Sequence, residues 1–268
     1  MIDKILLFPY WLTLKLRHFM YDHGMKKVHV ADVPTICVGN ITVGGTGKTP
    51  HTEMIVRLLS QDSLWGSKNI AVLSRGYKRR TKGFQQVVCE GSAKLFGDEP
   101  LQIKRKFPSV TVAVDKSRKQ GCGFLSDPEQ VQTSKKARKC LHKDFPKADL
   151  IILDDAFQHR AVKPTVSIVL VDYNRPVFED HLMPIGKLRD LRERIGAADI
   201  VIVSKCPRFL DPWERSKWTE ALKIRKDQHI FFTTIGYFCT PCQKERQDTD
   251  TVMHRYNIKT GETEIISG

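Results

Sequence analysis

A glycine-rich run between a β-branched segment and a helix-forming segment constrains this chain more than any other feature. The run reads Gly44, Gly45, Thr46, Gly47, Lys48 and Thr49, and it follows the apolar residues 35–38. In loops of this kind successive N–H groups wrap a β-phosphate, a lysine such as Lys48 reaches the β- and γ-phosphates, and a hydroxyl such as that of Thr49 can ligate Mg²⁺. The order of strand, loop and helix therefore predicts a P-loop that binds a nucleoside triphosphate.

The loop departs from the usual phosphate-binding pattern at one position. That pattern, G-x-x-x-x-G-K-[ST], starts with a glycine, and here Thr42 occupies this place and is followed by Val43. Because the rest of the run lies between a predicted strand and a predicted helix, the context still indicates a P-loop. The expected nucleotide-binding set comprises residues 42–49.

Short β-branched runs, each ending in polar residues or glycine, recur along the chain. The predicted strands are residues 35–38, 70–73, 110–114, 150–153, 168–171 and 200–203. Apolar runs of this length are typical of strands buried on both faces of a parallel sheet. The intervening segments are long enough for crossover helices, as at residues 51–59 and 98–106. We therefore predict an α/β fold with a doubly wound, mainly parallel sheet.

Two carboxylates follow one of these strands. Residues 150–153 lead into Asp154 and Asp155, which places both at the carboxyl edge of the sheet, where the P-loop also opens. One of them can hold Mg²⁺ as a Walker B aspartate, and the alternative is an N-cap for the next helix. Further polar residues expected at this edge are Arg75, Asp98, Glu99, Asp115, Arg118 and Arg189. Each alone fits a solvated loop, whereas together they can position substrate phosphates.

Charge and the last predicted strand bear on the ligand. The formal net charge of +14 favours anionic partners, which include nucleotides, phosphorylated substrates, nucleic acid and acidic lipids. Ser204 and Lys205 end the sixth predicted strand, the place that contacts the base in some P-loop proteins. The aspartate that usually accompanies a guanine-reading lysine is missing there, so the sequence favours ATP.

The N-terminal segment has the pattern of an amphipathic basic helix. Residues 3–23 place apolar side chains at helical spacing with lysine, arginine and histidine among them. The helix either packs on the domain core or lies in a membrane interface with Trp11 at the headgroups, and the total charge favours the interface. No apolar run reaches the roughly 18–20 residues that span a bilayer, and no secretory cleavage pattern is present, so a soluble or peripheral protein is expected.

The seven cysteines are scattered without the spacing of a disulfide framework, which is typical of a reducing cytosol. Only Cys239 and Cys242 form a C-x-x-C pair. A structural zinc site needs two further ligands at suitable spacing, and the sequence offers no second pair. We therefore predict no metal at that pair.

At this point the ordered motifs resemble those of the tetraacyldisaccharide 4′-kinase family, the lipid A kinases of Gram-negative bacteria. The matching segments are residues 38–50, 73–77 (L-S-R-G-Y), 97–100 (G-D-E-P), 154–160 (D-D-A-F-Q-H-R) and 184–189 (P-I-G-K-L-R). The resemblance covers about residues 5–235, and in the family the first P-loop position is commonly not glycine, as at Thr42.

The resemblance implies phosphorylation of the 4′-hydroxyl of a tetraacyldisaccharide 1-phosphate by ATP and Mg²⁺. It implies a peripheral protein on the cytoplasmic face of the bacterial inner membrane with a lipid-linked disaccharide phosphate as its partner, and we expect a monomer that binds no nucleic acid. Asp98 resembles the family's candidate catalytic base. Glu99, Asp154 and Asp155 resemble its metal-organising carboxylates, with Thr49 as a further metal ligand. The residues that resemble its active-site cleft are Lys48, Arg118, His159 and Arg189.

The correspondence ends after Thr234. The family's histidine partner of the catalytic base belongs to a C-terminal segment that nothing here matches, and His254 stands alone. The expected organisation is an N-terminal helix at residues 1–30, a P-loop kinase domain at 31–235 and a truncated or divergent region at 236–268. The alternative function is a catalytically impaired member that acts as a nucleotide-binding module. A nucleic-acid-associated NTPase is weaker, because no nucleic-acid motif occurs.

Overall fold

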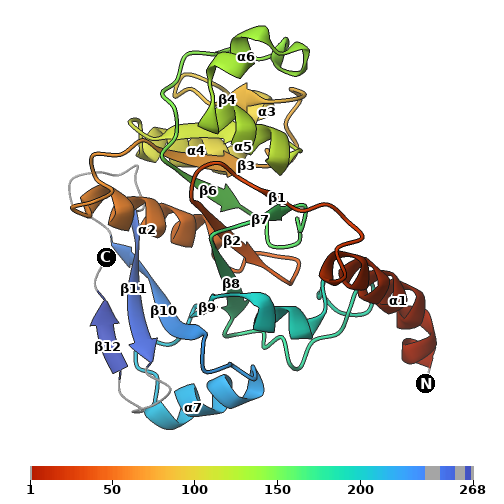
Figure 1. The fold of residues 1–268 in the computed structure, drawn as a ribbon. Helices are drawn as coiled ribbons and strands as arrows, with labels where there is room; N and C mark the ends of the chain where they lie inside the picture. Colours follow the sequence, from red (N-terminus) through yellow and green to blue (C-terminus); the bar gives the residue numbers. More distant parts are fainter. Residues whose placement is uncertain (1, 239–247, 257–262, 267–268) are drawn as a thin grey trace. The chain divides into compact units, whose positions relative to one another are not determined.

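The computed structural model describes residues 2–238, 248–256 and 263–266. The chain divides into two compact units, and each is described by itself. The P-loop unit comprises residues 1–25, 39–54 and 167–268, and the carboxylate unit comprises residues 26–38 and 55–166. The division falls within β2 (Thr35–Asn40) and within α2 (Lys48–Gln61), the two elements on either side of the glycine-rich loop (Figure 1).

The strands of the carboxylate unit form a mainly parallel array. Their order is β2, β6 (Leu150–Asp154), β3 (Ile70–Ser74), β5 (Thr111–Val114) and β4 (Gln85–Gln86). The pairs β2–β6, β6–β3 and β3–β5 are parallel, and only β4 runs antiparallel to its neighbour. β3, β5 and β6 are buried at every position, as the apolar runs predicted. The carboxyl ends of these strands consequently meet at one edge.

Short helices connect the strands of this unit. They are α3 (Ala93–Phe96), α4 (Asp98–Lys106), α5 (Arg118–Ser126), α6 (Glu129–Thr133) and the 3₁₀ turn η1 (Lys135–Ala137). α4 confirms the predicted helix at residues 98–106. A Cβ on Gly121 would lie 2.6 Å from Leu73 Cδ2, so glycine lets α5 approach β3 closely. A parallel pair of two-residue strands, β1 (His29–Val30) and β7 (Val162–Lys163), completes the unit.

The P-loop unit contains a second array, in which the first strand pairs are parallel and the last are antiparallel. The order is β8 (Val166–Asp172), β9 (Ile200–Ser204), β10 (His229–Phe238), β11 (Asp248–Tyr256) and β12 (Thr263–Ile266). β8, β9 and β10 pair in parallel, and β10, β11 and β12 pair antiparallel. None of β10, β11 and β12 is among the six predicted strands. The connection at 257–262 lies outside the described residues.

Helix α1 (Ile2–Asp22) confirms the predicted N-terminal helix, and the unit also has η2 (Arg192–Ala197) and α7 (Pro212–Ala221). Leu14 and His18 are buried and mark the face of α1 that packs on the unit. The helix therefore packs on its unit, which was one of the two interpretations of its pattern. Its other side carries exposed apolar side chains. Among the described residues, no helix is long and apolar enough to cross a membrane.

Candidate functional site

The glycine-rich loop leaves β2 and enters α2 at Lys48, inside the P-loop unit. Gly44 and Gly47 have φ values of 117° and 80°, a region that side chains with a Cβ rarely adopt. Val43, Gly44 and Gly45 are exposed, whereas Thr46 is buried. The backbone of the loop therefore lies open at its first glycines and is anchored at its threonine.

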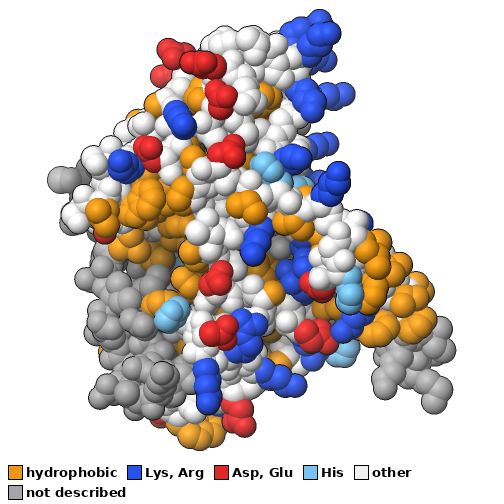
Figure 2. All heavy atoms as spheres, in the orientation of Figure 1, with side chains coloured by type: hydrophobic (Ala, Val, Ile, Leu, Met, Phe, Trp, Pro, Cys, Tyr) orange, Lys and Arg blue, Asp and Glu red, His pale blue; other side chains and the backbone are white. Residues whose placement is uncertain are grey.

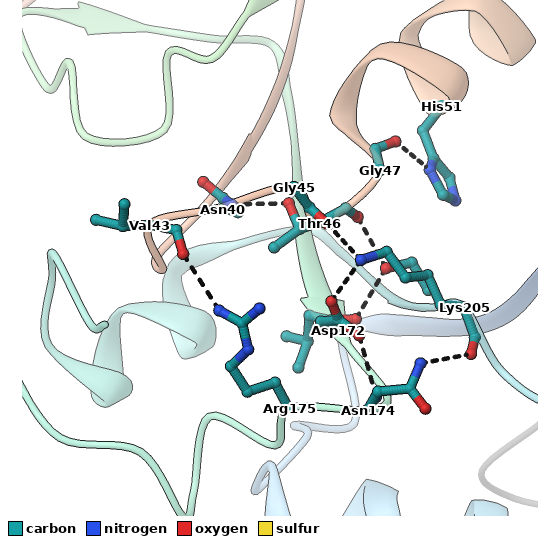
Figure 3. A network of polar contacts seen from close by, with 12 residues as sticks. Asn40, Val43, Gly45, Thr46, Gly47, His51, Asp172, Asn174, Arg175 and Lys205 are labelled. Carbon is teal, nitrogen blue, oxygen red and sulfur yellow. Dashed lines mark hydrogen bonds and ion pairs between the residues drawn. The ribbon is translucent and has the colours of Figure 1, made fainter. Parts of the chain in front are cut away.

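Four carbonyl groups of the loop accept hydrogen bonds from side chains outside it (Figure 3). The donors are Arg175 to Val43 (3.5 Å), Lys205 to Gly45, Ser204 to Thr46 (2.8 Å) and His51 to Gly47 (2.7 Å). Each peptide is planar and trans, so a held carbonyl fixes the opposite direction of the next N–H. The N–H groups fixed in this way belong to residues 44, 46, 47 and 48, and that of Thr46 donates to the Gly44 carbonyl at 3.1 Å. Oriented N–H groups such as those of residues 44, 47 and 48 suit a concave anion site.

His51 is fully buried in the first turn of α2. Its Nδ1 lies 2.7 Å from the Gly47 carbonyl oxygen, and its Nε2 lies 2.9 Å from the hydroxyl of Thr233 on β10. Burial lowers the pKa of His51 to about 4, so the ring is uncharged at neutral pH. Since a carbonyl only accepts, Nδ1 carries the proton and Nε2 accepts from Thr233. Sequence reasoning missed His51, although it follows Lys48-Thr49-Pro50 directly.

The ends of β8 and β9 supply a second anchor. Lys205 Nζ lies 2.7 Å from Asp172 Oδ2 and also donates to the Gly45 carbonyl. Asn174 Nδ2 is 3.5 Å from the Lys205 carbonyl oxygen, and Lys205 itself has a positive φ of 61°. Ser204 and Lys205 were expected at a base-contacting edge, and here their side chains contact the P-loop backbone. Asp172 was not predicted, although it directly follows the predicted strand 168–171.

Arg189, which we expected at the carboxyl edge of the sheet, is hydrogen-bonded to residues at the P-loop. Its Nη2 donates to Asn40 Oδ1 at 2.6 Å, and Asn40 Nδ2 donates to Thr46 Oγ1 at 2.7 Å. Its backbone N–H donates to the Ile41 carbonyl at 2.8 Å, and a β-bridge pairs Thr42 with the residue before it, Leu188. The segment that carries Arg189 is consequently joined to the P-loop by both backbone and side-chain hydrogen bonds.

Three carboxylates of the carboxylate unit interact electrostatically. Asp154 ends β6 and is buried, with the Ser74 hydroxyl donating to its Oδ2 at 3.1 Å. Burial, followed by the charges of Glu99 and Asp155, raises the pKa of Asp154 to about 6. Glu99 and the preceding Asp98 are exposed in the first turn of α4. Glu99, Asp154 and Asp155 thus interact electrostatically, and Asp98 precedes Glu99 in the chain.

Arg118 is 2% exposed and binds backbone carbonyls rather than a carboxylate. Its Nη1 donates to the Asp115 carbonyl and its Nη2 to the Asp154 carbonyl, each at 2.7 Å. Burial lowers the pKa of Arg118, and the nearby Asp154 and Asp155 charges oppose that effect. The guanidinium therefore joins the carboxyl ends of β5 and β6. His159 is half-buried in the turn after β6, where its N–H donates to the Ala156 carbonyl at 2.7 Å.

The predicted metal ligands are the hydroxyl of one threonine and the carboxylates of two acidic residues. Thr49 belongs to the P-loop unit, and Glu99 and Asp155 belong to the carboxylate unit. Within the described part of the chain, no cluster of three or more His, Cys, Asp or Glu side chains has the geometry of a metal site. Oxygen donors of this kind suit Mg²⁺, which binds through few protein ligands together with substrate phosphates. Cys239 and Cys242 lie outside the described residues.

A mainly parallel α/β fold with an anion-binding loop between β2 and α2 defines the class of P-loop nucleotide-binding proteins. Within that class, the chain belongs to the tetraacyldisaccharide-1-P 4′-kinase family, LpxK, whose sequence profile matches residues 4–241.

Named relatives and one solved structure agree with this family. Tetraacyldisaccharide 4′-kinase of Phocaeicola vulgatus is 45% identical over 222 residues, which is 83% of this chain and 56% of that protein. The protein of the same name from Porphyromonas gingivalis is 43% identical over 229 residues, 85% of this chain and 58% of that one. The chain thus spans little more than half the length of these relatives. The apo form of LpxK from Aquifex aeolicus, solved in complex with ATP, superposes with a TM-score of 0.66 at 27% identity, covering 89% and 67% of the two chains.

The raised pKa of Asp154 predicts a specific pH dependence of stability. A carboxyl whose pKa rises from 3.8 to about 6 on folding is protonated more readily in the folded state. The contribution of this carboxyl to the free energy of unfolding therefore falls as the pH rises from below 3.8 to above about 6. The total fall is about 3 kcal/mol. Without nucleotide or metal, we expect the stability advantage of Asp154→Asn over the native chain to grow by about 2 kcal/mol between about pH 4.5 and about pH 7.5.

Urea unfolding at both pH values measures this difference. Asp144→Asn, which changes an exposed carboxylate of the same unit, serves as the control and should show no comparable growth. A pH-independent difference for Asp154→Asn would mean that Asp154 titrates near its ordinary pKa in the folded chain.

Proposed function

We propose that this chain transfers the γ-phosphate of ATP to the 4′-hydroxyl of a tetraacyldisaccharide 1-phosphate, a lipid-linked disaccharide phosphate. The observation that carries the proposal is the set of P-loop peptide planes held by Arg175, Lys205, Ser204 and His51, since such a loop suits the β-phosphate of a nucleotide. The family supplies the acceptor: its members carry the name of this reaction.

The nucleotide and metal roles follow from residue chemistry. Lys48 would lie along the β- and γ-phosphates, and the Thr49 hydroxyl would ligate Mg²⁺ with Asp155 and Glu99. Mg²⁺, when bound, neutralises negative charge on the phosphate oxygens. Burial and then the charges of Glu99 and Asp155 raise the pKa of Asp154, and this supports a cation at these carboxylates, because a positive charge there favours the ionised form. Residues 42–49 form the nucleotide-binding set of this proposal.

The transfer itself needs a base and oriented charges. Asp98 would accept the proton of the 4′-hydroxyl while the hydroxyl oxygen forms a bond to the γ-phosphorus. The bond between that phosphorus and the oxygen bridging to the β-phosphate breaks, and ADP leaves. Asp98 is exposed in the first turn of α4, where a substrate hydroxyl can reach it. Arg189 and His159 would stabilise charge in the cleft, and Arg118 would hold the strand ends that carry Asp154 and Asp155.

Helix α1 supports a membrane-bound substrate. Apolar side chains gather on its outer face (Figure 2). They are Phe8, Trp11, Leu12, Leu16 and Phe19, each between 38% and 56% exposed. An aromatic and aliphatic stripe beside basic residues, on a chain of net charge +14, fits the interface of an anionic bilayer. We propose peripheral contact with the cytoplasmic face of the inner membrane by a monomer, with no nucleic-acid partner.

Replacing Lys48 tests the kinase proposal. Lys48→Ala should lower transfer of labelled γ-phosphate from ATP to tetraacyldisaccharide 1-phosphate in detergent micelles at least about 100-fold, because charge stabilisation at the γ-phosphate is lost. Lys226→Ala, at an exposed position of the same unit, is the matched control. Equal activity of Lys48→Ala and the native chain would refute the P-loop role. If the native chain binds ATP but transfers no phosphate, the result would instead favour the alternative function, a nucleotide-binding module.

Replacing Asp98 separates the proposed base from nucleotide binding. Asp98→Asn keeps the size of the side chain and removes its basicity, so kcat should fall by about 10²–10⁴-fold. The dissociation constant for ATP, measured by calorimetry, should stay within about twofold of the native value. A parallel loss of ATP affinity would show that Asp98 supports the nucleotide site rather than the acceptor hydroxyl.

The exposed stripe on α1 predicts lipid binding that depends on apolar area. The double variant Leu12→Gln, Leu16→Gln should reduce partitioning onto vesicles of anionic phospholipid at least about tenfold, since two buried leucine side chains are lost from the interface. Vesicle co-flotation measures the effect, and Phe209→Gln, an exposed apolar position elsewhere in the same unit, is the control. Unchanged partitioning of the double variant would assign the membrane contact to another surface.

A further inference from the structure

A buried histidine connects the P-loop to a strand far away in the sequence. His51 and Thr233 are both fully buried, and they lie 182 residues apart within the P-loop unit. Thr233 is on β10, where it pairs with Met253 of β11. No motif identifies Thr233, because hydroxyl side chains are common in strands. Its hydroxyl nonetheless meets the one ring nitrogen of His51 that does not face the loop.

The other ring nitrogen controls one peptide of the loop. The Gly47 carbonyl accepts two hydrogen bonds from His51: one from the backbone N–H at 3.2 Å and one from Nδ1 at 2.7 Å. That carbonyl shares a peptide plane with the N–H of Lys48, so its direction also sets the direction of this N–H. Gly47 adopts a positive φ of 80°, and glycine has little conformational preference of its own there. The orientation of this peptide is therefore set by the hydrogen bonds that its carbonyl accepts, and the shorter of the two comes from the His51 side chain.

We propose that Thr233 and His51 form a positioning pair for the nucleotide site. Thr233 holds the imidazole, and the imidazole holds the Gly47–Lys48 peptide in the orientation that binds a β-phosphate. The inference rests on the proposed nucleotide-binding function of the loop. Neither side chain touches the nucleotide, because both are fully buried, and the effect passes through the peptide plane.

A purely structural pair would behave differently from a positioning pair. If the two hydrogen bonds only satisfy buried polar groups, their loss lowers stability and leaves the affinity of the folded protein for ATP unchanged. If they position the peptide, affinity depends on which ring nitrogen is replaced. Asn at position 51 places an amide donor near the Nδ1 position, whereas Gln reaches toward the Nε2 position and leaves the Gly47 carbonyl without its side-chain donor.

Four single variants test this with MgATP as the probe. The dissociation constant, measured by calorimetry below the unfolding temperature of each variant, should rise about 5- to 10-fold for His51→Gln and about 2- to 5-fold for Thr233→Val. His51→Asn should stay within about twofold of the native value. Thr234→Val is the matched control, because that hydroxyl donates to the Pro207 carbonyl at 3.2 Å, and it should bind as the native chain does.

A double variant shows whether the pair acts as a unit. With Asn at position 51 the Thr233 hydroxyl has no imidazole to hold, so adding Thr233→Val to His51→Asn should not weaken ATP binding further. An additive loss would mean that Thr233 acts without His51 and would overturn the pair.

Binding as the readout separates this inference from the proposed function. Native affinity in both His51→Gln and Thr233→Val would overturn the positioning pair and leave the nucleotide site intact. A native chain that does not bind ATP would overturn both, whereas ATP binding without phosphate transfer to the lipid has no bearing on the pair.

Discussion

The orientation of the P-loop peptides is the constraint on which the rest of this structure depends. A glycine-rich loop has no stable conformation of its own, so its carbonyls must be held from outside if its N–H groups are to face an anion. Here the holding groups are His51 in the first turn of α2, Ser204 and Lys205 at the end of β9, and Arg175 after β8. The parallel strands β8 and β9 consequently bring Arg175, Ser204 and Lys205 to the loop, whereas His51 comes from α2.

The cluster of Glu99, Asp154 and Asp155 has the opposite charge from the chain as a whole. A net charge of +14 coexists with a buried Asp154 whose pKa rises to about 6 beside Glu99 and Asp155. Arg118 does not neutralise them by direct pairing, because its hydrogen bonds go to the Asp115 and Asp154 carbonyls. A divalent cation at this cluster would act against the burial and the charges that raise the pKa of Asp154, so its binding would be linked to release of a proton.

The sequence predicted what local patterns determine and missed what distant contacts determine. The six apolar runs became strands and residues 98–106 became α4, because burial on both faces leaves a readable pattern. β10 was missed: Thr233, Thr234 and Gly236 interrupt its apolar run, and its strand character comes from pairing with β9 and β11. The P-loop was predicted, but its supports His51 and Asp172 were not, since their roles depend on partners elsewhere in the chain. The catalytic and metal roles of the site residues stay predictions.

Helix α1 joins its exposed apolar face to the nucleotide loop through a short series of contacts within one unit. The Tyr10 hydroxyl donates to the Arg189 carbonyl at 3.0 Å, and His18 Nε2 lies 2.6 Å from Asp190 Oδ1 in a buried pair. Arg189 in turn binds Asn40, which binds Thr46 in the P-loop. A kinase whose acceptor remains anchored in a bilayer by its acyl chains must hold its phosphate donor at a fixed height above that bilayer. On the proposed function, α1 and these contacts would set that height, because all of the contacting residues belong to the same unit as the loop.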